Sequence, residues 1–199
     1  DMKGFEKVKT YTEIYKKCGM LSSKTIMGHG IHLDKSELEM LAKSKTSVAH
    51  CPTSNAPIKE DGLGSGLFDF KMIEKAGIRW ALASDIGGGP YVSMFDVMRS
   101  FVAQNNKKKV KGATYTKALY RSTLAGAEIL KIDKKKGNLA RGKEANFITV
   151  DFPKNLKSKK IEDILEKIVL KHKSSRELYD AMVNNVHFQG KRQGNRVDE

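Results

Sequence analysis

Three short apolar segments, each followed by a helix pattern, constrain the fold of this chain more than any other feature. The segments 24–30, 46–51 and 78–85 are apolar and bounded by turn-forming residues, as buried strands are. Strands that alternate with helices pair in parallel, because the helix carries the chain back to the start of the next strand. The sequence therefore predicts an α/β fold built on a parallel sheet.

Local signals place the helices between and after these strands. Asp34 followed by Glu37 forms a capping-box pattern, which predicts a helix start at this point. Further helices are predicted at Leu67–Lys75, Met94–Gln104, Tyr115–Leu130 and Ile161–Lys171. Residues 53–66 are rich in Ser, Asn, Pro and Gly and are predicted to form a loop. Two more strands are predicted, one after a turn within residues 142–151 and one at Val183–Gln189.

The length of the chain limits how complete this fold can be. A closed (β/α)₈ barrel needs about 250 residues and eight strands, whereas this chain has 199 residues and three convincing strand–helix units. It also begins at Asp1 and not at a methionine. We therefore expect the C-terminal part of a larger protein, with a small open α/β domain as the alternative. Residues 1–136 are expected to hold the strand–helix units, and residues 137–199 to form a separate segment.

Composition argues against several classes of protein. No apolar stretch approaches the roughly 20 residues that cross a bilayer, and the N-terminus has no signal-peptide pattern. Cys18 and Cys51 are the two cysteines, and no CxxC pair occurs. This argues against a disulfide scaffold and a cysteine-rich zinc module and favours reduced thiols. We expect a cytoplasmic protein with no membrane partner.

The chain is strongly basic, with 37 Lys and Arg against 23 Asp and Glu and a net charge of +14. Such a charge is compatible with nucleic-acid binding. The lysines are spread along the whole chain, however, and the short runs at 107–109 and 134–136 have no interleaved aromatic residues. The pattern favours a solvated surface. A non-catalytic module that binds nucleic acid is therefore the less favoured alternative.

A polar side chain stands at the end of each predicted strand: His29, His50 and Asp85. The carboxyl ends of parallel strands are where active sites assemble in α/β proteins. We therefore expect His29 and Asp85 to lie close together on one rim of the sheet, with the strand that ends at His50 between theirs. Three residues of metal-ligand or acid–base type in succession make this rim the candidate site.

Each of these residues also has a structural interpretation. Asp85 precedes three glycines that would let backbone approach a ligand, yet it could instead cap the helix that begins near Ser93. His29 could be a hydrogen-bonded core histidine. For His50 a structural role is favoured: a buried strand end, followed by a proline-directed turn whose Ser and Asn side chains bond the backbone.

Several motifs together resemble those of the guanine deaminases of the amidohydrolase superfamily. They are Met27–Leu33 (MGHGIHL), Ala49–Asn55 (AHCPTSN), Gly64–Phe68 (GSGLF), Ala83–Pro90 (ASDIGGGP), Ser93–Met98 (SMFDVM) and Gly137–Phe147 (GNLARGKEANF). The resemblance implies a metal-dependent (β/α)₈ TIM barrel whose last three strands are present here. It also implies that residues from 137 onward return to a small β-domain.

The resemblance further implies a reaction and residue roles. A zinc-activated water would hydrolyse guanine to xanthine and ammonia, a step of purine catabolism, with one Zn²⁺ per active site. Asp85 matches the family's metal-binding aspartate, which also takes a proton. His29 matches the histidine that hydrogen-bonds the metal water or the substrate. Both residues are thus expected to be catalytic and to contact a small purine, in a protein that could be a homodimer.

The sequence departs from the family pattern in two ways. It contains neither the His-x-His pair nor the His-x-x-Glu motif of the family's earlier strands. One carboxylate and one imidazole are too few ligands for a catalytic zinc site, so this chain alone is expected to bind zinc poorly and to be inactive. The alternative within the superfamily is an aminohydrolase for methylthioadenosine, adenosylhomocysteine, a triazine or another heterocycle.

Overall fold

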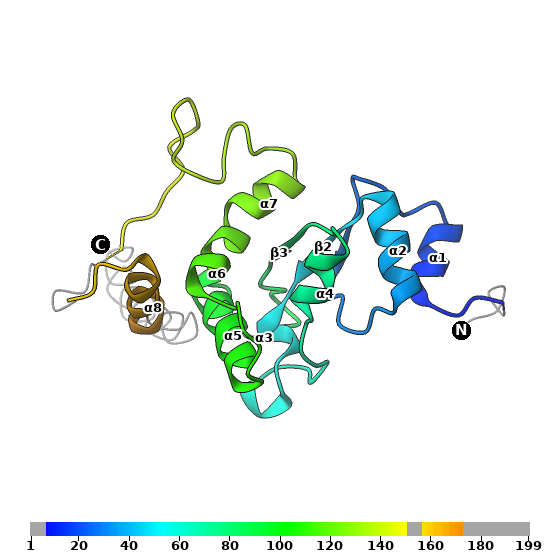
Figure 1. The fold of residues 1–199 in the computed structure, drawn as a ribbon, viewed down its shortest axis with the longest axis horizontal. Coiled ribbons are helices and arrows are strands. Elements are labelled where there is room, and N and C mark those ends of the chain that lie inside the picture. Colours follow the sequence, from blue (N-terminus) through cyan, green and yellow to red (C-terminus); the bar gives the residue numbers. More distant parts are fainter. Residues whose placement is uncertain (1–6, 151–156, 173–199) are drawn as a thin grey trace, which may run out of the picture.

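A three-stranded parallel sheet lies at the centre of the computed structural model, which describes residues 7–150 and 157–172 (Figure 1). The strands are β1 (Ile26–Gly28), β2 (Ser47–His50) and β3 (Trp80–Leu82), in the order β1-β2-β3. Both pairs are parallel, as the sequence predicted. The strands are shorter than the apolar segments, because the chain turns sharply at the strand ends.

Helices surround this sheet in the described part of the chain. They are α1 (Tyr11–Lys17), α2 (Lys35–Ser44), α3 (Pro52–Asn55), the 3₁₀ helix η1 (Ile58–Glu60), α4 (Phe70–Lys75), α5 (Met94–Lys107), α6 (Tyr115–Ser122), α7 (Leu124–Ile129) and α8 (Ile161–Lys171). None of the helices described here combines the length and the hydrophobicity that crossing a membrane requires. The capping box of α2 is confirmed: Asp34 accepts a hydrogen bond from Glu37 N, and the Glu37 carboxylate accepts one from Asp34 N.

Three features of the helices differ from the sequence prediction. The predicted loop 53–66 contains α3 and η1, since Pro52 begins a short helix instead of a turn. The single helix expected over 115–130 is two helices, because the backbone of Thr123 leaves the helical region with φ −129° and ψ −91°. Helix α1 was not predicted; the Thr10 side chain caps it by accepting a hydrogen bond from Glu13 N.

No strand forms over the described residues 142–150, so the strand predicted there is not found in that range. A strand needs a hydrogen-bonded neighbour, and this stretch lies away from the sheet (Figure 1). Phe147 and Ile148 are exposed accordingly. The strand predicted at Val183–Gln189 lies outside the described residues. The predicted helix Ile161–Lys171 is present as α8.

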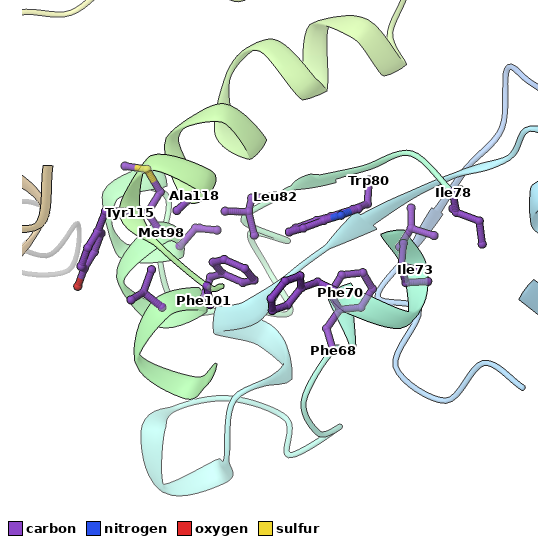
Figure 2. Packing of buried hydrophobic residues seen from close by; sticks show 14 of the residues in the cluster. Phe68, Phe70, Ile73, Ile78, Trp80, Leu82, Met98, Phe101, Tyr115 and Ala118 are labelled. Atoms are coloured by element: carbon purple, nitrogen blue, oxygen red, sulfur yellow. The ribbon is translucent and has the colours of Figure 1, made fainter. Parts of the chain in front are cut away.

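An aromatic core between the sheet and its helices supports the strand ends (Figure 2). The ring of Trp80 on β3 lies 5.3 Å from that of Phe68 and 5.6 Å from that of Phe101, centroid to centroid. Phe70 packs against both Trp80 and Phe101. All four side chains are almost completely buried. Because Trp80 belongs to β3, this cluster fixes the strand that leads to Asp85.

A charged cluster closes one side of this core. Glu74 forms ion pairs with Lys117, at 2.9 Å, and with Arg121, at 2.8 Å. The Arg121 guanidinium also lies 4.3 Å from the centre of the Trp80 ring and donates a hydrogen bond to Trp80 O. Helix α6 is thereby tied to both α4 and β3.

Candidate active site

His29 and Asp85 meet at the carboxyl ends of the strands. His29 directly follows β1, Asp85 lies three residues beyond β3, and His29 Nε2 is 3.8 Å from Asp85 Oδ2. The expectation that they share one rim, with β2 between their strands, is confirmed. Their side chains are 44% and 33% exposed, so a small molecule can reach both. The rim therefore presents an imidazole and a carboxylate side by side.

Both residues have a backbone conformation that is uncommon for residues other than glycine, with φ of 66° at His29 and 51° at Asp85. At His29, Gly30 N donates a hydrogen bond to Gly28 O, which makes His29 the centre of a tight γ-turn. At Asp85, the amides of Gly88 and Gly89 both donate to Asp85 O, at 3.0 and 2.7 Å. Strained backbone of this kind clusters at functional sites.

The glycines after Asp85 allow the chain to pack closely around the carboxylate. A Cβ at Gly88 would lie 2.8 Å from Asp85 Oδ2, which is closer than real contacts allow. Asp85 does not cap helix α5: the Ser93 side chain does so, by accepting a hydrogen bond from Phe95 N. The structural interpretation of Asp85 as a helix cap is therefore wrong, and its carboxylate remains at the rim.

His50 is part of the core, in line with the structural role that the sequence favoured. It is 2% exposed and stacks on Phe68 with ring centroids 4.3 Å apart. Burial lowers the pKa of His50 to about 3, and the neighbouring His29 adds to this effect. The imidazole is thus neutral at physiological pH, and His50 belongs to the packing of the core.

The turn after His50 differs from the prediction. The Asn55 side chain bonds the ring of His29 and not the backbone, and Ser54 Oγ is buried without a hydrogen-bond partner in the described part of the chain. The reason is that α3 forms here and points these side chains inward. His32, the next histidine after His29, is exposed.

A thiol that sequence reasoning did not assign to the site lies beside the pair. Ligand atoms of His29, Cys51 and Asp85 all lie within 4.8 Å of one another. Burial raises the pKa of the Cys51 thiol to about 11, and the Asp85 carboxylate contributes to the rise. The sequence predicted one carboxylate and one imidazole at the rim; Cys51, directly after β2, adds a third type of metal-binding atom.

A parallel sheet with polar side chains at its carboxyl rim is typical of α/β enzymes, and comparison with known proteins identifies the family. Residues 2–192 match the amidohydrolase family, to which this chain belongs. Guanine deaminase from Mus musculus is 33% identical over 148 residues, which cover 72% of this chain and 32% of the mouse protein. The chain thus spans about a third of the length of the curated relatives that it matches.

Solved structures give the same result. The Escherichia coli guanine deaminase superposes with a TM-score of 0.65 and 29% identity, covering 72% of this chain and 32% of the bacterial one. A guanine deaminase from C. acetobutylicum, solved with guanine in its active site, superposes with a TM-score of 0.59 and 27% identity over 71% of this chain and 33% of that one. The predicted amidohydrolase fold is confirmed for the part that this chain contains.

Proposed function

We propose that this chain supplies part of the active site of a zinc-dependent aminohydrolase that converts guanine and water to xanthine and ammonia. The observation that carries the proposal is the contact between His29 and Asp85 at the rim, in a chain whose relatives include guanine deaminases. The pair has the two groups that hydrolytic deamination needs at one point, a proton acceptor and a hydrogen-bond donor.

The residues at the rim suit zinc. Carboxylate oxygen, imidazole nitrogen and thiol sulfur are the three donor types that zinc takes in proteins, and all three lie within 4.8 Å of one another here. Asp85 is the residue that we propose as the zinc ligand. When bound, zinc would supply a water that loses its proton near neutral pH.

The two rim residues would divide the remaining work. The Asp85 carboxylate would accept the proton of the attacking water, since a carboxylate is a general base and this one lies at the rim within reach of a small molecule. His29 would donate a hydrogen bond from Nε2 to the oxygen that adds to the amino-bearing carbon of guanine. The exposure of both side chains allows a flat base to approach them.

Groups outside this sequence complete the proposed site. A His-x-His pair and a His-x-x-Glu motif are absent from the sequence, and on the family pattern their Glu would carry the proton to the leaving nitrogen. We therefore propose that this chain alone does not turn over guanine. The cytoplasmic location, the homodimer and the division of the chain near residue 137 also stay predictions.

The test is a single polypeptide in which this chain replaces the matching segment of the Escherichia coli enzyme, so that both motifs are supplied. We expect guanine loss and ammonia release, and we expect Asp85→Asn to lower turnover beyond the about 10²–10⁴-fold of a lost general base, because a metal ligand is lost as well. The amide is similar in size to the carboxylate, so circular dichroism should not change. His29→Asn should lower turnover but keep zinc.

Asp61→Asn, the same chemical change at an exposed position, is the matched control. Adenosine and a triazine serve as competing substrates, and preferential turnover of either would reassign the substrate. If Asp85→Asn kept more than about a tenth of the unmodified turnover, well above the range for a lost base, the role given to Asp85 would be wrong.

A further inference from the structure

Asn55, the last residue of α3, contacts the ring of His29 from the side opposite Asp85. Its side-chain nitrogen Nδ2 lies 3.1 Å from His29 Nδ1, whereas its oxygen Oδ1 lies 3.4 Å from the same atom. Asn55 is 2% exposed. Among the described residues, His29 provides the only hydrogen bond of this side chain. A buried amide without another partner strongly prefers to keep this bond.

The direction of this bond and the position of the proton on His29 are linked. In a neutral imidazole one nitrogen donates and the other accepts. The contact with the donor atom Nδ2 is the shorter of the two, which favours Nδ1 as the acceptor and Nε2 as the protonated nitrogen. The opposite edge of the ring agrees, because Nε2 faces Asp85 Oδ2 at 3.8 Å and an N–H there is attracted by the carboxylate.

Asn55 also lies on a firmly held segment. Gln104 Nε2 of α5 donates a hydrogen bond to Pro52 O at the start of α3, at 2.7 Å. Thr53 Oγ1, in the middle of α3, donates to Ser84 O next to Asp85, at 3.4 Å. Helix α3 is thus fixed both to α5 and to the loop that carries Asp85. The amide of Asn55 is therefore a stable reference for the orientation of the imidazole.

We propose that Asn55 is a positioning residue that holds His29 with its proton on Nε2, so that this nitrogen can donate a hydrogen bond at the rim. The importance of Asn55 for turnover rests on the function proposed above. The state of the His29 ring does not, because the contact exists in this chain without substrate. Asn55 acts through His29 and has no direct part in the chemistry.

The state of the ring can be read by nitrogen NMR of the histidine side chains in the 199-residue chain. The spectra are recorded at about pH 8.5, two units above the ordinary imidazole pKa of about 6.5. The His29 signals are assigned as those that are present in the spectrum of the unmodified chain and missing from that of His29→Gln. We expect an unprotonated Nδ1 and a protonated Nε2. In Asn55→Asp the proton should move to Nδ1, because a carboxylate can only accept. In Asn55→Leu the two tautomers should mix.

Asn106→Asp, the same change at an exposed position of α5, should leave the His29 signals as they are. A wild-type His29 protonated on Nδ1 would overturn the proposal, and this spectrum decides the matter even where a variant fails to fold. Identical His29 signals in the wild-type chain and Asn55→Leu would overturn it as well.

The same substitutions are made in the chimera with the Escherichia coli enzyme described above. There they separate this inference from the proposed function. Asn55→Leu should lower kcat, with KM and zinc content little changed, because the donor on Nε2 is no longer fixed. If no form of the enzyme acted on guanine, the deaminase assignment would fail and the NMR result would stand. If guanine turnover persisted with His29 protonated on Nδ1, the assignment would stand and Asn55 would lose its role.

Discussion

Gly88 and Gly89 both lie against the Asp85 loop, but a methyl group at each would meet different atoms. At Gly88 the nearest atom is Asp85 Oδ2, the end of a side chain that can rotate. At Gly89 the nearest atom is the backbone oxygen of Ser84, at 2.9 Å, with Ser54 N at 3.2 Å. Backbone cannot move aside as easily as a carboxylate. Gly88 therefore leaves room for the Asp85 carboxylate, whereas Gly89 allows two backbone segments to pack closely.

We expect Gly88→Ala to displace the Asp85 carboxylate while the fold stays nearly as stable as before. Gly89→Ala should instead lower the free energy of unfolding by about 1–3 kcal/mol, as overpacking does. Urea unfolding of the two variants measures the difference between their free energies of unfolding. Guanine turnover by the chimera with the Escherichia coli enzyme measures the effect of displacing the carboxylate. A larger loss of stability in Gly88→Ala than in Gly89→Ala would contradict this account.

The buried His50 makes stability depend on pH. In the folded chain burial lowers the pKa of His50 to about 3, whereas in the unfolded chain an imidazole titrates near 6.5. Below pH 6.5 His50 binds a proton in the unfolded state but not in the folded state, which favours unfolding. Above pH 6.5 His50 is neutral in both states, and this loss of stability is absent. The free energy of unfolding therefore falls as the pH drops from 6.5 toward 3, by up to about 1.4 kcal/mol per pH unit.

Chemical unfolding of the chain at pH 7 and pH 5 tests this expectation. In His50→Gln, which does not titrate, the loss of stability between the two pH values should be smaller than in the unmodified chain. His32→Gln, at an exposed position, should show the unmodified dependence. The slope is compared and not the absolute stability, because any change in the core is costly. Equal slopes in all three proteins would rule out a neutral, buried His50.

Sequence reasoning found some of the site residues and missed others for a physical reason. His29 and Asp85 were found because parallel strands place their carboxyl ends on one rim, so that the order of strands is enough to bring them together. Asn55 and Cys51 were missed as site residues. The Asn55 side chain reaches His29 from α3, whose position depends on contacts with α5 that a local pattern does not show. Cys51 directly follows β2, so the rule of strand ends could have found it.

At the scale of elements, helix α8 is bound to α6 through one carboxylate. Glu162 Oε1 accepts a hydrogen bond from Tyr115 N, at 2.6 Å, and Oε2 accepts one from Thr116 N, at 2.9 Å. These amides are at the start of α6 and have no partner within the helix. Burial alone would raise the pKa of Glu162, but the hydrogen bonds from Thr116 and Tyr115 outweigh it and lower the pKa. The carboxylate therefore acts as an N-terminal cap from another helix.

Removing this cap should cost about 0.5–2 kcal/mol, the usual effect of losing a capping side chain. We expect Glu162→Ala to lower stability by this amount and to speed hydrogen exchange at the amides of Tyr115 and Thr116. Glu166→Ala removes the same charge from an exposed position on α8 and is the matched control. Equal exchange rates in the two variants would show that Glu162 does not hold the start of α6.

The elements that the sequence predicted well are those with purely local signals. Helix α2 has its capping box, and α5 has its apolar stripe, within their own residues. The break at Thr123 and the missing strand over residues 142–150 depend on what lies nearby. Helix α7 turns at Thr123 to pack on β3. Within the described part of the chain, residues 142–150 have no strand beside them with which to pair. A local sequence pattern does not show which elements will be neighbours in the fold.

At the scale of the whole molecule, the chain carries its own support for the rim. The aromatic core packs against Trp80 of β3 (Figure 2). The Glu74 cluster ties α6 to the same strand. Helix α3 holds the loop after β3 through the hydrogen bond from Thr53 to Ser84. The geometry of His29 and Asp85 is therefore set by contacts within these residues. Over 72% of its length the chain also superposes on the Escherichia coli guanine deaminase.

The left-handed backbone at His29 and Asp85 lowers the stability of the fold at the two residues of the candidate site. Glycine adopts such angles without strain, whereas a residue with a side chain pays about 1 kcal/mol or more for them. Glycine would thus be the more comfortable residue at both positions. Under the proposed function, a change to glycine at either position would exchange turnover for stability. The proposed site therefore lies where the backbone conformation itself favours a residue without a side chain.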